Sequence, residues 1–398
     1  MTRAIATAWM LALLVQHPMA VGRFASTARV LLPGSRLPLV LAGGTSVSHA
    51  VVIGGGTIEG TQYVVPSDMQ PSAVTLVASA GGMLAIKHLQ IASPPAREAI
   101  AVATYEDGIT FADPRTFAPL GTLATGGAPS DIASFGTSVV TTDTDGDALT
   151  VAALQPWRVG AVAGVPFGDE IAADPPLHAY FVTERQLDGK GGVARIAGSD
   201  VRSVVTGLTA EGIAIDTHRQ RVYVADVNDD AVTALDARSM RVLFRIHDVP
   251  RAFSLALSAD FSRLFVVSNE GRGTPFGIAG RVTEFGVTGA RRVLARSAPL
   301  DFPVGVVYDR RDGTLLVTDE QANAVYVLDP RTLAQRRAPL RTCKTPWKPA
   351  IDDGSDRLFV PCAGSDEVDV FDARTLARVR GAPFRTGGYP LAVAVLRP

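Results

Sequence analysis

Acidic side chains end several short apolar runs of the sequence, and carboxylates that meet at one point can bind a cation. "YFVTE" ends at Glu184, "VYVAD" ends at Asp226, and "LLVTDE" carries Asp319 and Glu320. If these runs are strands that share a direction, their acids meet at one edge. Their oxygens then predict a site for a divalent cation, calcium or a similar ion. The alternative is that they are turn residues, because hairpins favour Asp in any β protein.

A second acidic pattern is typical of half a calcium-binding loop. "TDTDGDA" (142–148) places Asp143, Asp145 and Asp147 at alternate positions. The sequence lacks the glycine at the sixth position and the distal glutamate that complete an EF-hand loop. The three aspartates are therefore candidate metal ligands, and a polar hairpin is the alternative.

One loop is longer than its counterparts and is rich in glycine. "SNEGRGTPFGIAGR" (268–281) contains Asn269, Glu270 and Arg272, which can all bind a ligand through hydrogen bonds or charge. Long loops on rigid scaffolds often carry function, so the sequence predicts a ligand lid here. The alternative is an insertion without a role.

The elements that must position these residues recur along the chain. "AVYVLDPRTLAQRR" (324–337) returns in altered form as "GITFADPRTFAPLG" (108–121), "AVTALDARSMRVLF" (231–244) and "EVDVFDARTLARVR" (367–380). In each copy the Asp carboxylate can accept backbone N–H bonds in a tight turn between two strands. The apolar runs before these phrases recur about every forty residues, which is the period of a four-stranded propeller blade.

The best-formed unit, "EGIAIDTHRQRVYVADVNDDAVTALDARSMRVL", resembles the YVTN-type and NHL-type propeller repeats. The positions that match are Gly212, Ile213, Ala214, Ile215, Asp216, Tyr223, Val224, Ala225, Asp226, Val232, Leu235 and Asp236. The resemblance covers 303–388 well and 96–300 more loosely. It implies an all-β fold, a propeller of four-stranded antiparallel blades, and it is weak evidence for any one activity.

Two enzyme families with similar repeats supply an alternative function. Gluconolactonases bind a cation at the channel mouth that polarises a lactone carbonyl, and "YFVTERQLDGKGGVARI" (180–196) looks like a blade phrase of virginiamycin B lyase. Carried over residue by residue, only Glu184 and Asp226 match the functional positions of these families. The resemblance therefore implies a metal-dependent lactonase, hydrolase or lyase as an alternative to a binding protein.

Ring closure can be predicted from the C-terminal "GGYPLAVAVLRP", which begins a further unit but contains only its first strand. Such a strand can complete a blade at the other end of the chain and leave no free sheet edge. Eight blades are favoured, because 49–82 parallels 99–127. The alternative is seven, with "PLAVAV" pairing directly with "IAVATY". The expected organisation is a signal peptide at 1–22, an irregular segment at 23–48 and one propeller domain at 49–398.

The expected ring places the loops before the first strand and after the second strand of each blade on one face, around the channel mouth. Cys343 and Cys362 lie in two such loops of the same blade, so a disulfide between them is predicted, with two free thiols as the alternative. Trp347 and Lys348 follow Cys343 and are predicted to face the channel mouth as ligand-binding residues.

Charge and the N-terminal sequence limit which partners and which cellular location are expected. The 38 basic and 39 acidic residues give a formal charge of −1 without a basic block, so no nucleic-acid partner is expected. Arg3 precedes an apolar run (4–15) typical of a signal peptide, and no later segment is long enough to cross a membrane. A periplasmic or secreted protein is expected, with a cytoplasmic one as the alternative.

No serine-hydrolase elbow, zinc-protease motif or P-loop occurs in the sequence. The main hypothesis is therefore an exported monomeric scaffold that binds a protein or small-molecule ligand through its loop face. No cofactor beyond the divalent cation is indicated.

Overall fold

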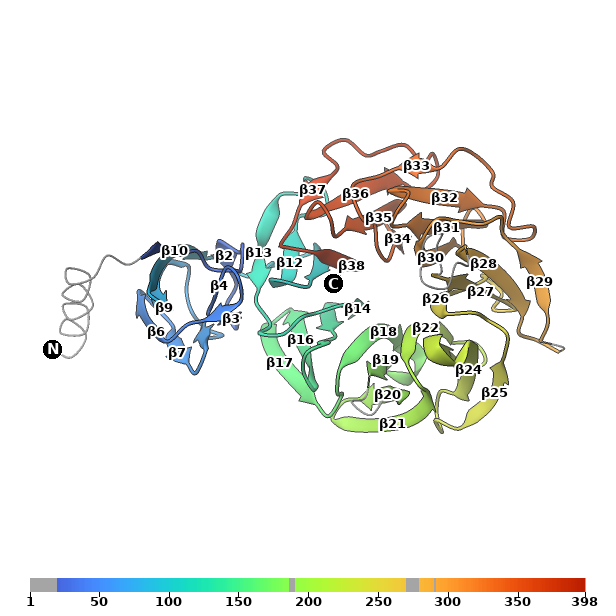
Figure 1. Ribbon diagram of the computed structural model, residues 1–398, viewed down its shortest axis with the longest axis horizontal. Coiled ribbons are helices and arrows are strands. Elements are labelled where there is room, and N and C mark those ends of the chain that lie inside the picture. The colour runs from blue at the N-terminus through green and yellow to red at the C-terminus, as the bar shows by residue number, and fades with distance from the viewer. Residues whose placement is uncertain (1–19, 186–189, 270–278, 290, 398) are drawn as a thin grey trace.

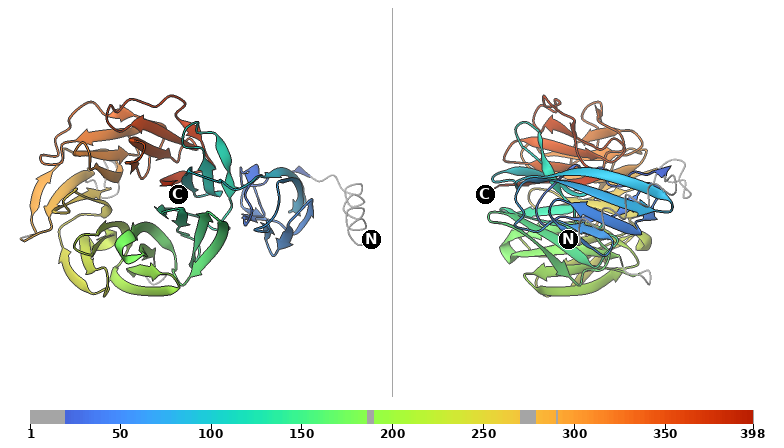
Figure 2. Two further views of the ribbon diagram at one scale, coloured as in Figure 1. Left: turned by 180° about the vertical axis from the view of Figure 1, so that it is seen from behind. Right: turned by 90° about the vertical axis from the view of Figure 1, so that its left-hand side faces the viewer.

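The computed structural model describes residues 20–185, 190–269, 279–289 and 291–397, and it shows an all-β protein (Figure 1). Seven four-stranded antiparallel blades surround a central axis, and a smaller β unit lies beside the first blade (Figures 1 and 2). Within the described chain the non-strand elements are two short 3-10 turns, η1 (Pro175–Leu177) and η2 (Val227–Asp229). None of the described residues belongs to a helix that is long and apolar enough to cross a membrane.

The blades are built from consecutive strands, except that the last strand of the chain is the innermost strand of the first blade. Each blade is given from the axis outward: the first consists of β38 (Pro390–Leu396), β11 (Ala99–Thr104), β12 (Gly108–Ala112) and β13 (Pro119–Leu123), and the second of β14 (Ile132–Phe135), β15 (Ser138–Thr141), β16 (Ala148–Leu154) and β17 (Trp157–Ala163). The third consists of β18 (Gly168–Asp174), β19 (Ala179–Arg185), β20 (Gly191–Ala197) and β21 (Asp200–Gly207), the fourth of β22 (Ala210–Asp216), β23 (Arg221–Asp226), β24 (Ala231–Asp236) and β25 (Val242–Ile246), and the fifth of β26 (Ala252–Leu257), β27 (Arg263–Ser268), β28 (Arg281–Gly286) and β29 (Val293–Arg296). The sixth consists of β30 (Pro303–Asp309), β31 (Thr314–Asp319), β32 (Ala324–Leu328) and β33 (Leu340–Arg341), and the seventh of β34 (Ala350–Asp352), β35 (Arg357–Cys362), β36 (Glu367–Asp372) and β37 (Phe384–Arg385).

The described residues form seven blades, so the prediction of eight blades is wrong. β38 pairs antiparallel with β11, and the register joins Ala99 to Leu396 and Ala103 to Ala392. This is the pairing that the seven-blade alternative predicted. The expected first blade at 49–82 is not formed, because its strands pair within the N-terminal unit, and the ring begins at β11 rather than at residue 49.

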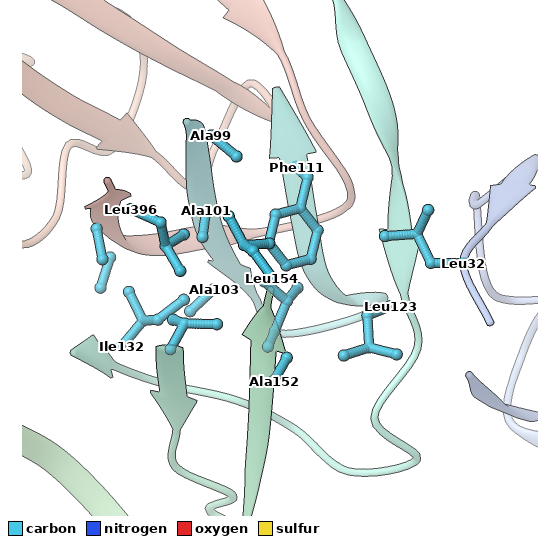
Figure 3. Packing of buried hydrophobic residues seen from close by; sticks show 14 residues of the cluster. Leu32, Ala99, Ala101, Ala103, Phe111, Leu123, Ile132, Ala152, Leu154 and Leu396 are labelled. Carbon is cyan, nitrogen blue, oxygen red and sulfur yellow. The ribbon is translucent and has the colours of Figure 1, made fainter. Parts of the chain in front are cut away.

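The core of the ring forms between neighbouring blades, because each blade packs on both of its faces. All six residues of β11 are buried, and successive side chains of a strand point to opposite faces. Ala101 and Ala103 pack with residues of the second blade, such as Ala152 (Figure 3). Ile100 and Val102 pack with residues of the seventh blade. The apolar composition of these strands follows from burial on both sides.

The N-terminal unit extends the first blade outward. Its strands are β1 (Ala20–Val21), β2 (Val30–Leu31), β3 (Arg36–Pro38), β4 (Val40–Leu41), β5 (Thr45–Ser46), β6 (His49–Ile53), β7 (Thr57–Glu59), β8 (Gln62–Val64), β9 (Ser72–Ala80) and β10 (Met83–Ile91). β2 lies between β10 and β13 and is parallel to both, so it covers the outer edge of the first blade. Leu32 is fully buried in the same cluster as Phe111 and Leu123 (Figure 3). The predicted signal peptide lies largely outside the described residues.

A buried carboxylate joins the N-terminal unit to the point where the ring closes. Asp107 follows β11 and accepts hydrogen bonds from the side chains of Ser26 and Thr27, at 2.6 and 2.7 Å. It also accepts the backbone N–H of Gly388, at 2.8 Å, just before β38. Burial opposes ionisation of Asp107, but these hydrogen bonds outweigh it and lower the pKa of its carboxyl.

We therefore expect Asp107→Asn to lower the free energy of unfolding by about 2 kcal/mol at neutral pH, because charge-assisted bonds are lost. A lowered pKa in the folded state stabilises the fold above the unfolded pKa. The difference between the two proteins should therefore shrink as the pH falls below about 4. Thermal unfolding from pH 7 to pH 3 measures it. A constant difference over this range would contradict the role of the charge.

The four repeated phrases form the turns that the sequence predicts. In each, the aspartate carboxylate accepts the backbone N–H two residues on, at 2.9–3.2 Å; the four are Asp113, Asp236, Asp329 and Asp372. The carboxylate also accepts the N–H three residues on. These aspartates have a structural role on the face opposite the channel mouth described below.

Candidate functional site

A pocket of about 590 Å³ lies at one end of the channel, and six of the seven blades line it. The lining residues are Tyr105, Glu106, Ser130, Asp131, Thr144, Asp145, Asp169, Glu170, Arg185, Glu211, Phe253, Trp347, Lys348, Tyr389 and Leu391. All belong to the starts of innermost strands, the loops before them, or the ends of second strands and the loops after them. We call this site the central pocket. The central pocket lies on the face where the sequence predicts the ligand-binding loops.

Lys348 reaches across the mouth of the channel to two acids of other blades. Its Nζ lies 2.5 Å from Oδ2 of Asp131, just before β14, and 3.1 Å from Oε2 of Glu170 in β18. The same carboxylate oxygens accept the backbone N–H groups of Ile171 and Ile213, so both acids are held in place. The Asp131 and Glu170 side chains are only 3% and 14% exposed. The floor of the pocket is therefore an ordered ionic cluster.

A second cluster of the same kind adjoins the first. The Nη2 of Arg185 at the end of β19 lies 3.0 Å from Oδ2 of Asp169 and 2.5–2.6 Å from both oxygens of Glu211. Asp169 and Glu211 occupy the starts of the innermost strands of the third and fourth blades. In both clusters, one basic side chain is bracketed by two carboxylates.

Protonation in these clusters is set by burial and by the neighbouring charges. Burial raises the pKa of Glu170 to about 7, against the opposing effect of Lys348. Burial also raises the pKa of Glu211 well above its usual range, and Asp169 adds to that shift. For Lys348 and Arg185, burial favours the neutral form, but the paired carboxylates outweigh it and raise both pKa values. The two basic groups therefore stay charged at neutral pH, whereas the carboxyl of Glu170 titrates close to neutral pH.

The pH dependence of stability should report this proton. Between a pKa of about 4.5 in the unfolded chain and about 7 in the folded one, only the folded state keeps the proton on Glu170, so rising pH destabilises the fold. We expect Glu170→Gln to lack this loss. Its unfolding temperature relative to that of the wild type should rise from pH 5 to pH 8. The exposed Glu59→Gln serves as a control and should follow the wild-type profile, and parallel profiles for Glu170→Gln would contradict the assignment.

Aromatic and acidic side chains form the outer part of the central pocket. Tyr105 and Tyr389 are in edge-to-face contact, with ring centroids 6.1 Å apart. The ring centroids of Phe253 and Trp347 are 6.2 Å apart. Glu106 is exposed beside the tyrosines. Partial burial raises its pKa, and the neighbouring acids Asp107 and Asp366 raise it further.

The ligand-binding candidates fall into two groups. Trp347 and Lys348 line the central pocket, as predicted. Asn269 is not among the lining residues, although its buried Oδ1 has no hydrogen-bond partner within the described chain. Glu270 and Arg272, with most of the predicted lid, lie outside the described residues.

None of the described candidates for the predicted carboxylate ring lines the central pocket, and three of them accept hydrogen bonds within or between blades. Glu184 accepts a hydrogen bond from Ser203 and Asp226 from Thr206 and Thr233, while Asp319 accepts the N–H groups of Asp301 and Phe302. Glu320 does not line the pocket. Burial raises the pKa of Tyr389, and the nearby Glu320 raises it further.

The three aspartates of the predicted calcium loop do not form a metal site either. Asp143 accepts the backbone N–H of Ala128 and of Asp145, which makes it a turn residue. Asp145 lines the central pocket, and Asp147 is exposed outside it. Across the ranges that the structure describes, no three His, Cys, Asp or Glu side chains form a group that could hold a metal ion. The donor sets proposed for a cation therefore do not fit one.

Sequence reasoning missed the acids that do meet at the channel mouth. Asp131, Asp169, Glu170 and Glu211 occur in "SDIASF", "GDEIAAD" and "AEGIAID", where each innermost strand begins. Aligning these starts would have placed the acids on one ring. The predicted ring used acids at the ends of the second strands instead, where Glu184 and Asp226 accept hydrogen bonds from hydroxyl groups.

The predicted disulfide is present. Cys343 and Cys362 are bonded, with their Cα atoms 5.7 Å apart and 19 positions apart in sequence. The bond ties the loop that carries Trp347 and Lys348 to the end of β35. The backbone N–H of Trp347 also bonds to Pro361 O, at 2.8 Å. The wall of the pocket in the seventh blade is therefore fixed twice.

Comparison with known proteins supports the propeller fold but does not assign the chain to a family. No protein-family model matches the chain, and no curated protein does. A protein of unknown function from Desulfotomaculum acetoxidans is 17% identical, covers 76% of this chain and 99% of its own, and has a TM-score of 0.63. A putative 6-phosphogluconolactonase from Bacteroides fragilis (13% identity, 76% and 98% coverage, TM-score 0.61) is similar. So is a periplasmic gluconolactonase from Pseudomonas aeruginosa (16% identity, 75% and 99% coverage, TM-score 0.60).

These identities are low, so the likenesses define the class of the protein, a β-propeller, and no activity. The matched share of the chain, about three quarters, is consistent with a ring that begins at β11.

Proposed function

We propose that this chain is a small-molecule-binding propeller whose ligand occupies the central pocket. The observation that carries the proposal is a cavity of about 590 Å³ at the channel mouth, lined by two ionic clusters whose carboxylates are largely buried. Concave sites with aromatic walls and a few ordered polar groups are the usual form of ligand sites. A rigid floor also lowers the entropic cost of binding, because the side chains are already ordered.

Tryptophan fluorescence tests this proposal, because Trp347 lines the pocket and Trp157 packs against Phe111 elsewhere. The probes are glucono-δ-lactone, gluconate, 6-phosphogluconate and choline. At least one should change the emission in a saturable way. Trp157→Phe should keep that response and Trp347→Phe should lose it. Absence of any response, or a response that survives in Trp347→Phe, would contradict binding in this pocket.

Lactone hydrolysis is the second candidate function. It is supported by the raised pKa of Glu170, since a general base is most effective with a pKa near the working pH. The names of the two lactonase-like propellers add to this support. If it holds, the protein hydrolyses glucono-δ-lactone faster than buffer does, and Glu170→Gln lowers kcat about 100-fold. A wild-type rate equal to that of buffer would exclude this activity for that substrate.

Export is proposed on the apolar N-terminal run and on the Cys343–Cys362 disulfide, because disulfides persist in oxidising compartments. A periplasmic or secreted protein that works as a monomer is the corresponding expectation. Cell fractionation with a C-terminal epitope tests the location. Light scattering of the purified protein tests the monomer.

A further inference from the structure

The balance of charge in the central pocket points to the class of ligand. Of its lining residues, six are acidic and two are basic, and the raised pKa values of Glu170 and Glu211 reduce this acidic excess at neutral pH without reversing it. Both basic groups, Lys348 and Arg185, are already bracketed by two carboxylates each. An incoming anion would have to compete with those carboxylates at short range, so the pocket disfavours carboxylate or phosphate ligands.

Two acids of the pocket remain without a basic partner among the described residues. Glu106 and Asp145 are both exposed and stand on the first and second blades, at the outer part of the pocket. The neighbours of Glu106 include Asp107 and Asp366, which are also acidic. Negative potential therefore accumulates on this side of the opening, and a positive ligand group would relieve it.

The aromatic residues provide the complementary surface. Tyr105 and Tyr389 belong to the first blade, whereas Phe253 and Trp347 belong to the fifth and seventh blades, so aromatic side chains from three blades line the pocket in two contacting pairs. Aromatic faces attract cations through their ring quadrupoles, and tryptophan does so most strongly. Exposed carboxylates beside aromatic side chains form an arrangement suited to binding an alkylated ammonium group.

We infer that the ligand of the central pocket is an organic cation, an amine or quaternary ammonium compound whose charged head lies between the aromatic walls and the side of the opening that carries Glu106 and Asp145. This inference rests on the proposed function, because it names the ligand class of the same site.

The test compares a cation with its uncharged isostere. Choline and 3,3-dimethyl-1-butanol have the same shape apart from nitrogen in place of carbon, and glucono-δ-lactone serves as an unrelated neutral probe. By calorimetric titration of the full chain, choline should bind about ten-fold more tightly than the isostere. The affinity for choline should fall as salt is added, because exposed carboxylates are screened.

Variants locate the charge effect. Glu106→Gln should weaken choline binding about three-fold or more and leave binding of the isostere unchanged. Glu59→Gln, at an exposed position in the N-terminal unit, is the matched control and should bind choline as the wild type does. A general loss of folding would lower the affinity for every probe, so the ratio of choline to isostere separates misfolding from loss of the charge contact.

The outcomes distinguish the two proposals. If the isostere binds as well as choline, or only glucono-δ-lactone binds, the organic-cation inference is wrong and the binding function stands. If no probe binds, both proposals fail for this chemistry. Tighter binding of choline that is sensitive to salt and to Glu106→Gln supports both.

Discussion

Replacing Lys348 by methionine is expected to lower the free energy of unfolding by about 3 kcal/mol at neutral pH, because two buried acids lose the cation between them. The side chain of Asp131 is almost fully buried, so water replaces the lost partner only in part. Chemical denaturation at pH 7 measures the effect. The loss should be smaller at pH 5 than at pH 8, since Glu170 can then take up a proton instead of facing Asp131 as a second anion.

A surface ion pair provides the control for this prediction. Arg385 lies 3.6 Å from Glu367, and its side chain is 80% exposed, so Arg385→Met should change stability by less than about 1 kcal/mol. If Lys348→Met were as mild as this control at pH 8, the ionic cluster would not be the rigid floor that the proposed function requires. The double variant Lys348→Met/Glu170→Gln should recover part of the loss, because one of the two acids is then uncharged.

Removing the disulfide with Cys343→Ala/Cys362→Ala is also expected to cost about 3 kcal/mol. A cross-link over 19 positions restricts the unfolded chain, and loops of this length give about that stabilisation. Thermal unfolding of the oxidised protein and of the double variant measures the difference. The variant should also bind any pocket ligand more weakly, because one of the two ties on the Trp347–Lys348 segment is lost.

Reductant supplies the control in the same assay. It should lower the unfolding temperature of the wild type toward that of the double variant and leave the variant unchanged. Equal unfolding temperatures for the oxidised wild type and the variant would show that the bond adds nothing to this blade.

Local patterns predicted much of the fold, because turn chemistry and strand periodicity act within a few residues. The turn aspartates such as Asp113, the Cys343–Cys362 bond and the place of Trp347 all follow from local sequence and blade order. The blade count did not follow, since 49–82 resembles a blade in its pattern. Only the pairing of β9 with β6 and β10, and of β38 with β11, decides where those strands go.

The ionic clusters could not be predicted for a related reason. Lys348 and Asp131 are 217 residues apart, and Lys348 and Glu170 are 178 apart. Whether acids at the channel mouth remain free to bind a metal or are neutralised by a basic side chain depends on which blades face each other across the axis. Glu184 and Asp226 show the opposite case, in which acids of the expected type turn inward to bind hydroxyl groups.

The closing strand also has a practical consequence for attaching the protein to a surface. β38 runs from the central pocket, where Tyr389 and Leu391 lie, to the other end of the channel, where Arg397 forms an ion pair with Asp352. An affinity tag or a sensor chip joined after residue 397 would therefore sit on the side away from the pocket. Immobilisation at that point should leave the opening free to the surrounding solution.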